Sequence, residues 1–386
     1  MEKLIIKNLG AIIDIDIQLS QLTIFIGKQG TGKSTLAKVI SIFRNESFWN
    51  DLFQQDDSTE TFLVYTEKYG IRTYFNHNTE IQYSYNKNRD FVFNYQQQKV
   101  SVDFSDDIKR IFSKFINAQE FDLYKAISSI LPAYETTYIP VERSLVTFLK
   151  DIVLTNAMKE VTLPSTILSF SAAYNDARKK VRKLEVDFLG VTYSSEEEED
   201  YLLLRNDSST KLPLALSASG MQFSVPTLVI FEAHKQKSTQ RSYAFEEPEI
   251  SLFPAAQEQL VQWVVSNVLS QNHNMLITTH SPYLITAINN LLMAGSIVEK
   301  HPESREEVAD ILGSSHFLTP DKVTAYYINN PEEYEDQQIN IEALINETTG
   351  LIAGKMIDSV SEEIHDTFSE LNRLLLHLKK QKIQQV

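Results

Sequence analysis

Alternating apolar and polar residues predict that the chain begins with β-strands. Isoleucine or leucine alternates with aspartate or glutamine from Ile13 to Leu19, and this period of two is typical of a half-buried strand. The apolar run from Leu22 to Ile26 predicts a buried central strand that stops at Gly27. A helical stretch follows from Lys33 to Phe43. We therefore expect strands, a glycine-bearing loop and a helix in close succession.

Residues 61–104 are rich in tyrosine, phenylalanine, valine and threonine. Turn-forming residues interrupt this stretch at Gly70, at 76–78 and at 86–88. Short β-rich runs separated by such turns are typical of an antiparallel meander, which we expect throughout this stretch.

From residue 106 to 186 the pattern is helical, with breaks at 138–143 and at Pro164. Residues 187–215 predict a hairpin, and the acidic run 196–200 is interpreted as a solvated loop near its turn. The later predicted elements are a helix at 216–234, a strand at 243–245, a helix from 255, a strand at 275–278, a helix ending near Gly295, a strand at 323–328 and a last helix at 360–375.

Composition limits the classes of function. The chain has 386 residues, 42% of them hydrophobic, and a net charge of −15 from 36 basic and 51 acidic residues. The absence of cysteine excludes disulfide scaffolds, thiolate zinc sites and cysteine nucleophiles. No run reaches the roughly 18 apolar residues of a membrane span, and the charged start is unlike a signal peptide. We expect a soluble cytoplasmic protein, in which a local basic groove is still compatible with the acidic balance.

Residues 27–35 fit the phosphate-binding pattern G-x-x-x-x-G-K-[ST], between the predicted strand and helix. Glycines let backbone N–H groups turn toward phosphate oxygens, and the helix N-terminus adds partial positive charge. Lys33 is expected to reach the β- and γ-phosphates of ATP, and Ser34 to bind Mg²⁺. The predicted nucleotide-binding residues are Gly27, Lys28, Gln29, Gly30, Thr31, Gly32, Lys33, Ser34 and Thr35.

Two further segments carry catalytic candidates. Glu246 and Glu247 follow the strand predicted at 243–245. Glu246 is expected to hold the water shell of Mg²⁺, and Glu247 to act as the general base for an attacking water. His280 follows the strand predicted at 275–278, where a neutral imidazole can contact the γ-phosphate or that water.

Ser219 and Gly220 lie near the start of the helix predicted at 216–234. Free N–H groups at a helix N-terminus form an anion site. Alone this pattern is an ordinary helix cap, but its position between the phosphate-binding loop and the acidic pair favours a nucleotide contact.

In this order, the motifs resemble those of ABC-type ATPases, and more narrowly the soluble SMC, RecF and OLD group. Residues 27–35 match the Walker A motif, 218–222 the signature motif, 245–249 the Walker B motif with its catalytic glutamate, and His280 the switch histidine. Glu246 departs from the aspartate usual at its position. No glutamine marks a Q-loop, for which 138–143 is the candidate segment, with Glu142 or Arg143 near the nucleotide.

The resemblance implies an α/β P-loop head of ABC type, with a mixed sheet, an antiparallel β subdomain and a helical insertion lobe. The expected divisions are 1–105 with Walker A and the meander, 106–186 as the helical lobe, 187–300 with the signature, Walker B and switch histidine, and 301–386 closing the head. Gly220 follows Gly32 by 188 positions, a longer interval than is typical of a transporter subunit. The sequence has no sustained heptads, which an SMC coiled coil would need. The 106 residues after His280 lack the acidic motifs of a Toprim nuclease.

The resemblance also implies an ATP-hydrolysing dimeric switch. Two copies would enclose two ATP molecules with Mg²⁺, each P-loop facing Ser219 and Gly220 of the other copy. Without a nuclease motif of its own, the chain is expected to control a separate effector, a nuclease or toxin, as in bacterial anti-phage systems. The alternative is a RecF-like repair ATPase that contacts DNA through the basic cluster 178–183. A third hypothesis, ATP as a structural clamp, is disfavoured by Glu247 and His280.

Overall fold

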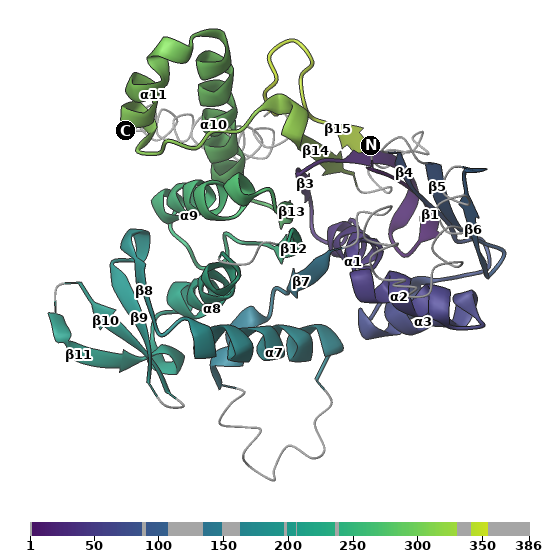
Figure 1. The fold of residues 1–386 in the computed structure, drawn as a ribbon, viewed down its shortest axis with the longest axis horizontal. Helices are drawn as coiled ribbons and strands as arrows, with labels where there is room; N and C mark the ends of the chain where they lie inside the picture. The colour runs from purple at the N-terminus through teal and green to yellow at the C-terminus, as the bar shows by residue number, and fades with distance from the viewer. Residues whose placement is uncertain are drawn as a thin grey trace, which may run out of the picture.

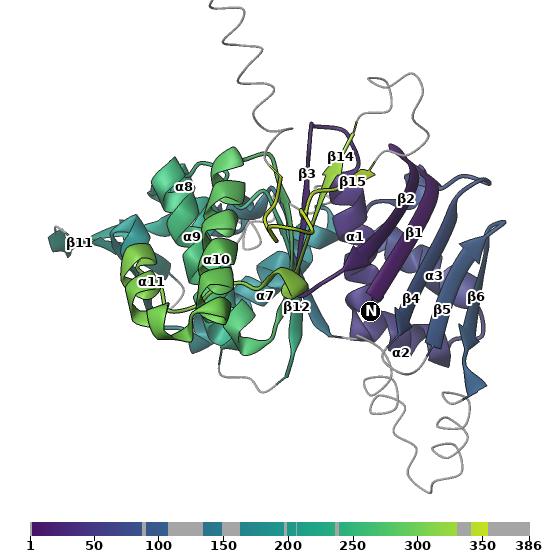
Figure 2. The same ribbon diagram turned by 90° about the horizontal axis from the view of Figure 1, so that it is seen from above.

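Three β-sheets and the helices packed against them form the fold (Figures 1 and 2). The structure is a computed structural model. It describes residues 2–86, 90–106, 134–148, 163–196, 199–205, 207–235, 239–329 and 341–353.

The central sheet has six strands in the order β15-β14-β3-β13-β12-β7. The strands are β3 (Leu22–Gly27), β7 (Glu135–Ile139), β12 (Arg241–Glu246), β13 (Asn274–Thr279), β14 (Val323–Ile328) and β15 (Ile341–Ala343). All are parallel to their neighbours except β15, which pairs antiparallel with β14. Every residue of β3, β12 and β13 is buried, as expected for strands of a parallel sheet that is covered on both faces.

Helices cover both faces of this sheet. The helix α1 (Lys33–Arg44) shares a core with Phe25, Ala244 and Leu276 on one face. On the other face, Ile24 and Phe245 pack in a second core with three helices. These helices are α8 (Ser219–His234), α9 (Pro254–Asn267) and α10 (Pro282–Lys300). Because the parallel strands all end at the same edge, the loops after β3, β7, β12 and β13 meet there.

A five-stranded antiparallel sheet packs against α1 on the far side from α8–α10 (Figure 2). Its order is β2-β1-β4-β5-β6. The strands are β1 (Glu2–Leu9), β2 (Ile12–Leu19), β4 (Glu80–Asn86), β5 (Asp90–Gln96) and β6 (Lys99–Phe104). Two more helices, α2 (Glu46–Gln54) and α3 (Ser58–Lys68), complete this layer. The predicted mixed sheet with a separate antiparallel subdomain is therefore confirmed.

A buried ion pair joins this subdomain to α1. The Arg44 side chain is 1% exposed and donates from Nε (2.9 Å) and Nη2 (2.9 Å) to the carboxylate of Glu2. The Tyr83 hydroxyl donates to the same carboxylate at 2.8 Å, so the charge of Glu2 is fully bonded. Burial lowers the pKa of Arg44, but the adjoining carboxylate outweighs this effect and raises the pKa above its ordinary value.

The meander predicted over 61–104 is wrong in its first part. Residues 58–68 form α3, and strands begin only at Glu80. Asp57 caps the helix by accepting from the backbone N–H groups of Thr59 (2.9 Å) and Glu60 (3.0 Å). The buried positions 61, 62, 65 and 66 follow helical spacing, which the aromatic and β-branched composition concealed.

The third sheet has the order β11-β10-β9-β8 and is antiparallel throughout. Its strands are β8 (Lys183–Val186), β9 (Val191–Glu196), β10 (Glu199–Leu204) and β11 (Asp207–Pro213). The interpretation of 196–200 as a solvated loop is wrong for Asp200, which is 4% exposed. Asp200 accepts from the hydroxyls of Tyr174 (2.8 Å) and Tyr193 (2.9 Å) and lies 3.1 Å from Nε of Arg178. This cluster attaches α7 (Ser165–Lys180) to the sheet.

The predicted end of one helix is wrong. The helix α10 does not end near Gly295 but continues to Lys300, and Gly295 instead gives the Leu318 carbonyl room to approach. The helix α8 runs through Pro226 without ending there. A further helix, α11 (Arg305–Leu312), follows α10. The expected last helix at 360–375 lies outside the described residues, as do residues 107–133 and 149–162 of the expected helical lobe.

Replacement of Asp200 by alanine should destabilise the protein by about 3–5 kcal/mol, because it leaves the buried Arg178 without a counter-charge. Urea denaturation would measure the loss of unfolding free energy. The control is Glu185→Ala, which breaks an exposed ion pair with Lys183 and should change stability by only about 0.5 kcal/mol. Equal effects of the two variants would contradict a structural role for Asp200.

Candidate nucleotide-binding site

The loop between β3 and α1 is shaped to receive phosphate. Gly30 and Gly32 have φ values of 78° and 99°, which only glycine adopts without strain. A Cβ on Gly32 would lie 2.9 Å from Cγ1 of Ile12, so a side chain there would collide with β2. Residues 28–30 form the exposed tip, Gly27, Thr31, Lys33 and Thr35 are buried, and Ser34 is exposed at the start of α1.

Lys33 lies under this loop. Its Nζ donates to the carbonyls of Gly27 (2.8 Å) and Lys28 (2.6 Å), and the Thr31 hydroxyl donates to Lys28 at 2.9 Å. Burial lowers the pKa of Lys33 to about 8, although the carboxylates of Glu247, Glu249 and Glu246 act in the opposite direction. Lys33 is therefore mostly protonated at neutral pH.

Glu246, the last residue of β12, has the properties of a metal ligand. It is 4% exposed, and its Oε1 has no hydrogen-bond partner among the described residues. An orphaned buried carboxylate oxygen suits a hard cation such as Mg²⁺, and the exposed Ser34 lies in the first turn of α1, which follows β3 at the same edge of the sheet. Burial and the charge of Glu246 together raise the pKa of the adjoining Tyr138 well above its usual range. These residues therefore fit a Mg²⁺ ion.

Glu247 and His280 form a pair at the mouth of the site. Oε1 of Glu247 lies 3.3 Å from Nε2 of His280, and both side chains are about a quarter to a third exposed. The hydrogen bond from His280 holds the pKa of Glu247 below its usual range, against the opposing effect of burial. The backbone of Glu247 is left-handed, with φ 41°, and its N–H donates to the Thr278 carbonyl at 2.9 Å. A strained residue held this way is typical of functional sites.

Glu249 orients the histidine loop, a role that the sequence analysis missed. Its Oε1 accepts from the Thr279 hydroxyl (2.7 Å) and from the His280 backbone N–H (2.8 Å). A second carboxylate two residues after Glu247 is visible in the sequence. That Glu249 lies next to the end of β13 could not be inferred from this spacing.

The structure also places the segment after β7. Arg143 is buried beside the acidic pair, whereas Glu142 is exposed. The guanidinium donates to the backbone carbonyls of Glu246 and Glu247, each at 2.8 Å. Arg143 thus supports the acidic pair from behind.

The helix α8 begins at Ser219, as the sequence predicts. Ser219 is exposed, and Gly220 packs against the turn after the acidic pair: a Cβ on Gly220 would lie 2.6 Å from the Ser251 carbonyl oxygen. Gln222 closes the preceding loop by donating to the carbonyls of Ala215 and Ser217, both at 2.9 Å. The signature segment is therefore tied to the acidic segment of its own chain.

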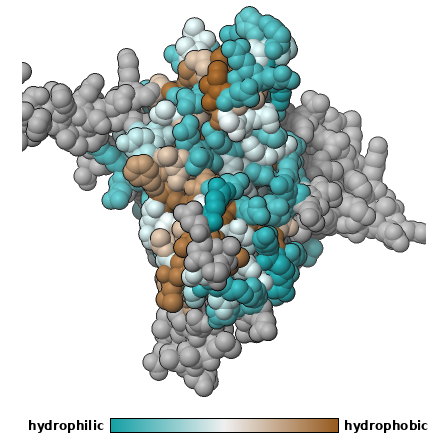
Figure 3. Space-filling view, turned by 90° about the vertical axis from the view of Figure 1, so that its left-hand side faces the viewer, coloured by the Kyte–Doolittle hydropathy of each residue, from teal (hydrophilic) through white to brown (hydrophobic). Residues whose placement is uncertain are grey.

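Four of the five basic residues of the cluster 178–183 are exposed, namely Lys179, Lys180, Arg182 and Lys183, and Arg178 is not. Arg178 is buried and paired with Asp200, Lys179 lies 3.3 Å from Asp176, and Lys183 lies 3.6 Å from Glu185. The face that carries α11 and the β8–β11 sheet is mostly hydrophilic, with apolar residues in separate patches (Figure 3). Among the helices that the structure describes, none combines the length and apolar character needed to cross a bilayer.

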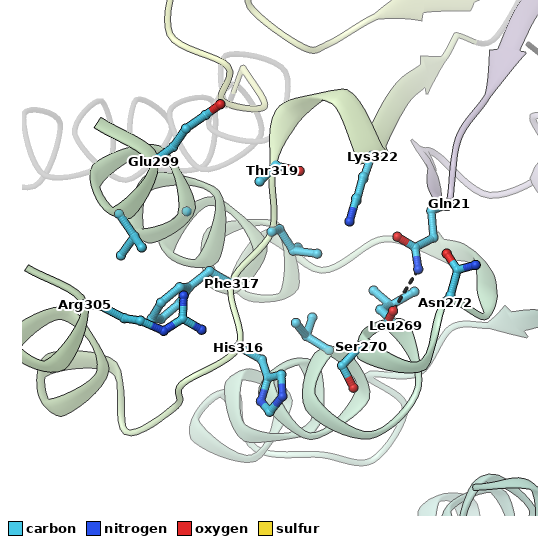
Figure 4. A pocket seen from close by; sticks show the side chains of 14 residues that line it. Gln21, Leu269, Ser270, Asn272, Glu299, Arg305, His316, Phe317, Thr319 and Lys322 are labelled. Carbon is cyan, nitrogen blue, oxygen red and sulfur yellow. Dashed lines mark hydrogen bonds between the residues drawn. The ribbon is translucent and has the colours of Figure 1, made fainter. Parts of the chain in front are cut away.

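A cavity of about 450 Å³ lies at the opposite edge of the central sheet (Figure 4). Gln21, just before β3, and Lys322, just before β14, line it together with Arg305 and His316. Gln21 donates to the Leu269 carbonyl at 2.8 Å and braces this edge. The cavity is separated from the P-loop by the length of the strands, so it does not belong to the candidate site.

A P-loop between β3 and a helix, a histidine after the adjacent parallel strand β13 and an acidic pair after the next strand, β12, define a P-loop nucleotide-binding protein. A family described as an AAA ATPase domain matches residues 1–146 and 153–285, which is more than half of the chain. The chain belongs to this AAA ATPase domain family, in agreement with the expectation from its motifs. No curated protein sequence matches the chain.

Solved structures similar to the chain include three SMC heads. The SMC head domain from Thermotoga maritima has 13% identity and a TM-score of 0.39, covering 74% of this chain and 90% of its own. An Smc head bound to the C-winged helix domain of ScpA has 12% identity and a TM-score of 0.44, covering 90% and 98%. An Smc head with an extended coiled coil, bound to the C-terminal domain of ScpA derived from Pyrococcus furiosus, has 11% identity and a TM-score of 0.43, covering 95% and 100%.

The Gly220→Ala substitution should destabilise the protein by about 1–3 kcal/mol, because the new methyl group would displace the Ser251 carbonyl. Ser219→Ala is the matched control: Ser219 is exposed, and its replacement should change stability by only about 0.5 kcal/mol. Thermal and urea denaturation of the two variants would measure the difference. Wild-type stability in Gly220→Ala would show that the two segments are not in contact.

Proposed function

We propose that this protein hydrolyses ATP and acts as an ATP-gated dimeric switch. The observation that carries the proposal is the meeting of three groups at one sheet edge. These are the buried Lys33 under its loop, the orphaned oxygen of Glu246, and the pair formed by Glu247 and His280. Together they supply a phosphate cradle, a metal ligand and a general base.

The P-loop binds the phosphates of the substrate ATP through its backbone N–H groups and the Lys33 ammonium group. Ser34 and Glu246 are the residues that would hold Mg²⁺, directly or through its water shell. When bound, Mg²⁺ neutralises negative charge on the phosphate oxygens. The exposed Ser34 and the buried Glu246 thus have distinct parts in one metal site.

Glu247 accepts the proton of the attacking water, whose oxygen forms the new bond to the γ-phosphorus as the bond to ADP breaks. Its lowered pKa keeps it deprotonated and ready at neutral pH. His280 holds the carboxylate through the 3.3 Å contact, and Glu249 holds the loop that carries His280. The products are ADP and inorganic phosphate.

A second copy of the chain is the partner that the exposed signature segment fits. Ser219 presents the N-terminus of α8 to solvent, where a helix attracts negative charge. Leu216, just before it, is 74% exposed, and Phe253, after the Ser251 turn, is 79% exposed. Burial of two such side chains would favour association, and the nucleotide of the second copy would complete the contact.

The output of the switch is proposed from the sequence resemblance alone. We assign it to a separately encoded nuclease or other toxic effector in bacterial anti-phage defence, acting in the cytoplasm where ATP is available. The RecF-like alternative would contact DNA through the exposed part of the basic cluster, Lys179, Lys180, Arg182 and Lys183, because Arg178 is buried and paired with Asp200.

Glu247→Gln should bind ATP but lose about 10²–10⁴-fold in hydrolysis, since an amide cannot accept the proton. The variant should accumulate as an ATP-bound dimer, measured by light scattering beside a phosphate-release assay. Lys33→Ala is the control and should bind no ATP and form no such dimer. Wild-type turnover in Glu247→Gln would assign the base to another carboxylate, and a monomer in ATP would refute the dimeric switch.

A further inference from the structure

Arg143 connects three segments that are far apart in the sequence. Its side chain is fully buried and donates four hydrogen bonds, all to backbone carbonyls. The acceptors are Phe223 (2.9 Å, from Nε), Glu246 (2.8 Å) and Pro140 (3.2 Å), both from Nη1, and Glu247 (2.8 Å, from Nη2). One guanidinium therefore joins the end of β7, the signature helix α8 and the acidic pair.

The partners of Arg143 differ from those of the other fully buried arginine described above. Arg44 bonds directly to the carboxylate of Glu2, as expected for a structural ion pair. Arg143 bonds only to carbonyls, and burial lowers its pKa to about 10 despite nearby carboxylates. A carbonyl cage around a charged group compensates its desolvation less completely than a carboxylate does. The arrangement fixes positions of backbone rather than neutralising a charge.

The contact with α8 falls at the signature end of that helix. Phe223 lies four residues after Ser219, and its ring also contacts the guanidinium, at 5.3 Å from the ring centre. The ring of Phe245, next to the acidic pair, also lies against the guanidinium, with its centre 5.0 Å from Cζ. Pro226 lacks the N–H that would bond Gln222 and so loosens the helix ladder beside Phe223. A shift of the first turn of α8 would therefore displace the guanidinium of Arg143.

On the other side, Arg143 determines where Glu247 sits. It donates to the carbonyls of both Glu246 and Glu247. The left-handed backbone of Glu247 is strained, so these hydrogen bonds help to hold it in place. The Gly220–Ser251 contact brings the same two segments together a second time. Movement of α8 and the position of the general base are thus mechanically connected within one chain.

We infer that Arg143 is a positioning residue that couples the two ATP sites of the dimer: through its hydrogen bonds to Phe223, Glu246 and Glu247, engagement of the partner's nucleotide by α8 sets the general base at the chain's own nucleotide. This inference rests on the proposed dimeric switch. It makes hydrolysis cooperative in ATP, because each chain becomes competent only when the other chain's nucleotide is in place.

Arg143→Lys tests the coupling. Lysine keeps the charge, but its single ammonium cannot reach four carbonyls in a planar fork. The variant should bind ATP with wild-type affinity and still dimerise, while single-turnover hydrolysis falls about 10- to 100-fold, because a misplaced base is poorly aligned. The dependence of rate on ATP should change from sigmoidal in the wild type to hyperbolic.

Two matched variants separate positioning from stability. Arg44→Lys changes the other buried arginine and should lower the melting temperature without changing the rate per folded molecule. Glu142→Gln changes the exposed neighbour and should alter neither. If Arg143→Lys does not fold, Phe223→Leu removes only the ring contact and should lower the rate about threefold with a reduced Hill coefficient, because the hydrogen bond to the backbone carbonyl of residue 223 remains.

The outcomes distinguish this inference from the proposed function. A wild type that neither hydrolyses ATP nor dimerises would refute the proposed function itself. A wild type that does both, with hyperbolic ATP dependence, would overturn only the coupling. Sigmoidal kinetics and an unchanged rate in folded Arg143→Lys would likewise overturn it, whereas a slow, hyperbolic Arg143→Lys beside a normal Arg44→Lys would support it.

Discussion

The parallel pairing of β3, β13 and β12 is the constraint on which the rest of the structure depends. Parallel strands must be buried on both faces, which explains the apolar residues in the middle of each strand and the helices on either side. They also end at the same edge, so residues separated by more than 200 positions meet where each strand stops. Charged groups can be placed there without entering either core.

The charged side chains at this edge suit a ligand that consists of a phosphate group and a metal cation. Three carboxylates, of Glu246, Glu247 and Glu249, lie near two buried cations, Lys33 and Arg143. Burial lowers the pKa of both cations because the charged forms lose water, and the carboxylates partly restore it. Oε1 of Glu246 has no hydrogen-bond partner among the described residues and is therefore available as a metal ligand. The carboxylates therefore offset part of the free-energy cost of burying Lys33 and Arg143.

The fully buried arginines Arg44 and Arg143 join segments of the chain in different ways. Arg44 attaches the antiparallel subdomain to α1 through a buried ion pair with Glu2, to which the Tyr83 hydroxyl also donates. Arg143 holds backbone carbonyls from separate segments and leaves each free to take part in other bonds. The first arrangement stabilises one state, whereas the second lets the position of one segment depend on another.

Local patterns in the sequence were sufficient for the strand and helix on either side of residues 28–32, the strand before Glu247, the strand 323–328 and the start of α8, because each depends on neighbouring residues. They were insufficient wherever long-range contacts decide. The segment of α3 has a composition typical of strands, but its packing makes it a helix. Asp200 lies in a run that predicts a loop, but it is buried and neutralises Arg178. The role of Arg143 depends on Phe223, which is 80 residues away in the sequence. Tertiary structure decided these cases, since the free energy of a buried polar group is set by partners that only the fold supplies.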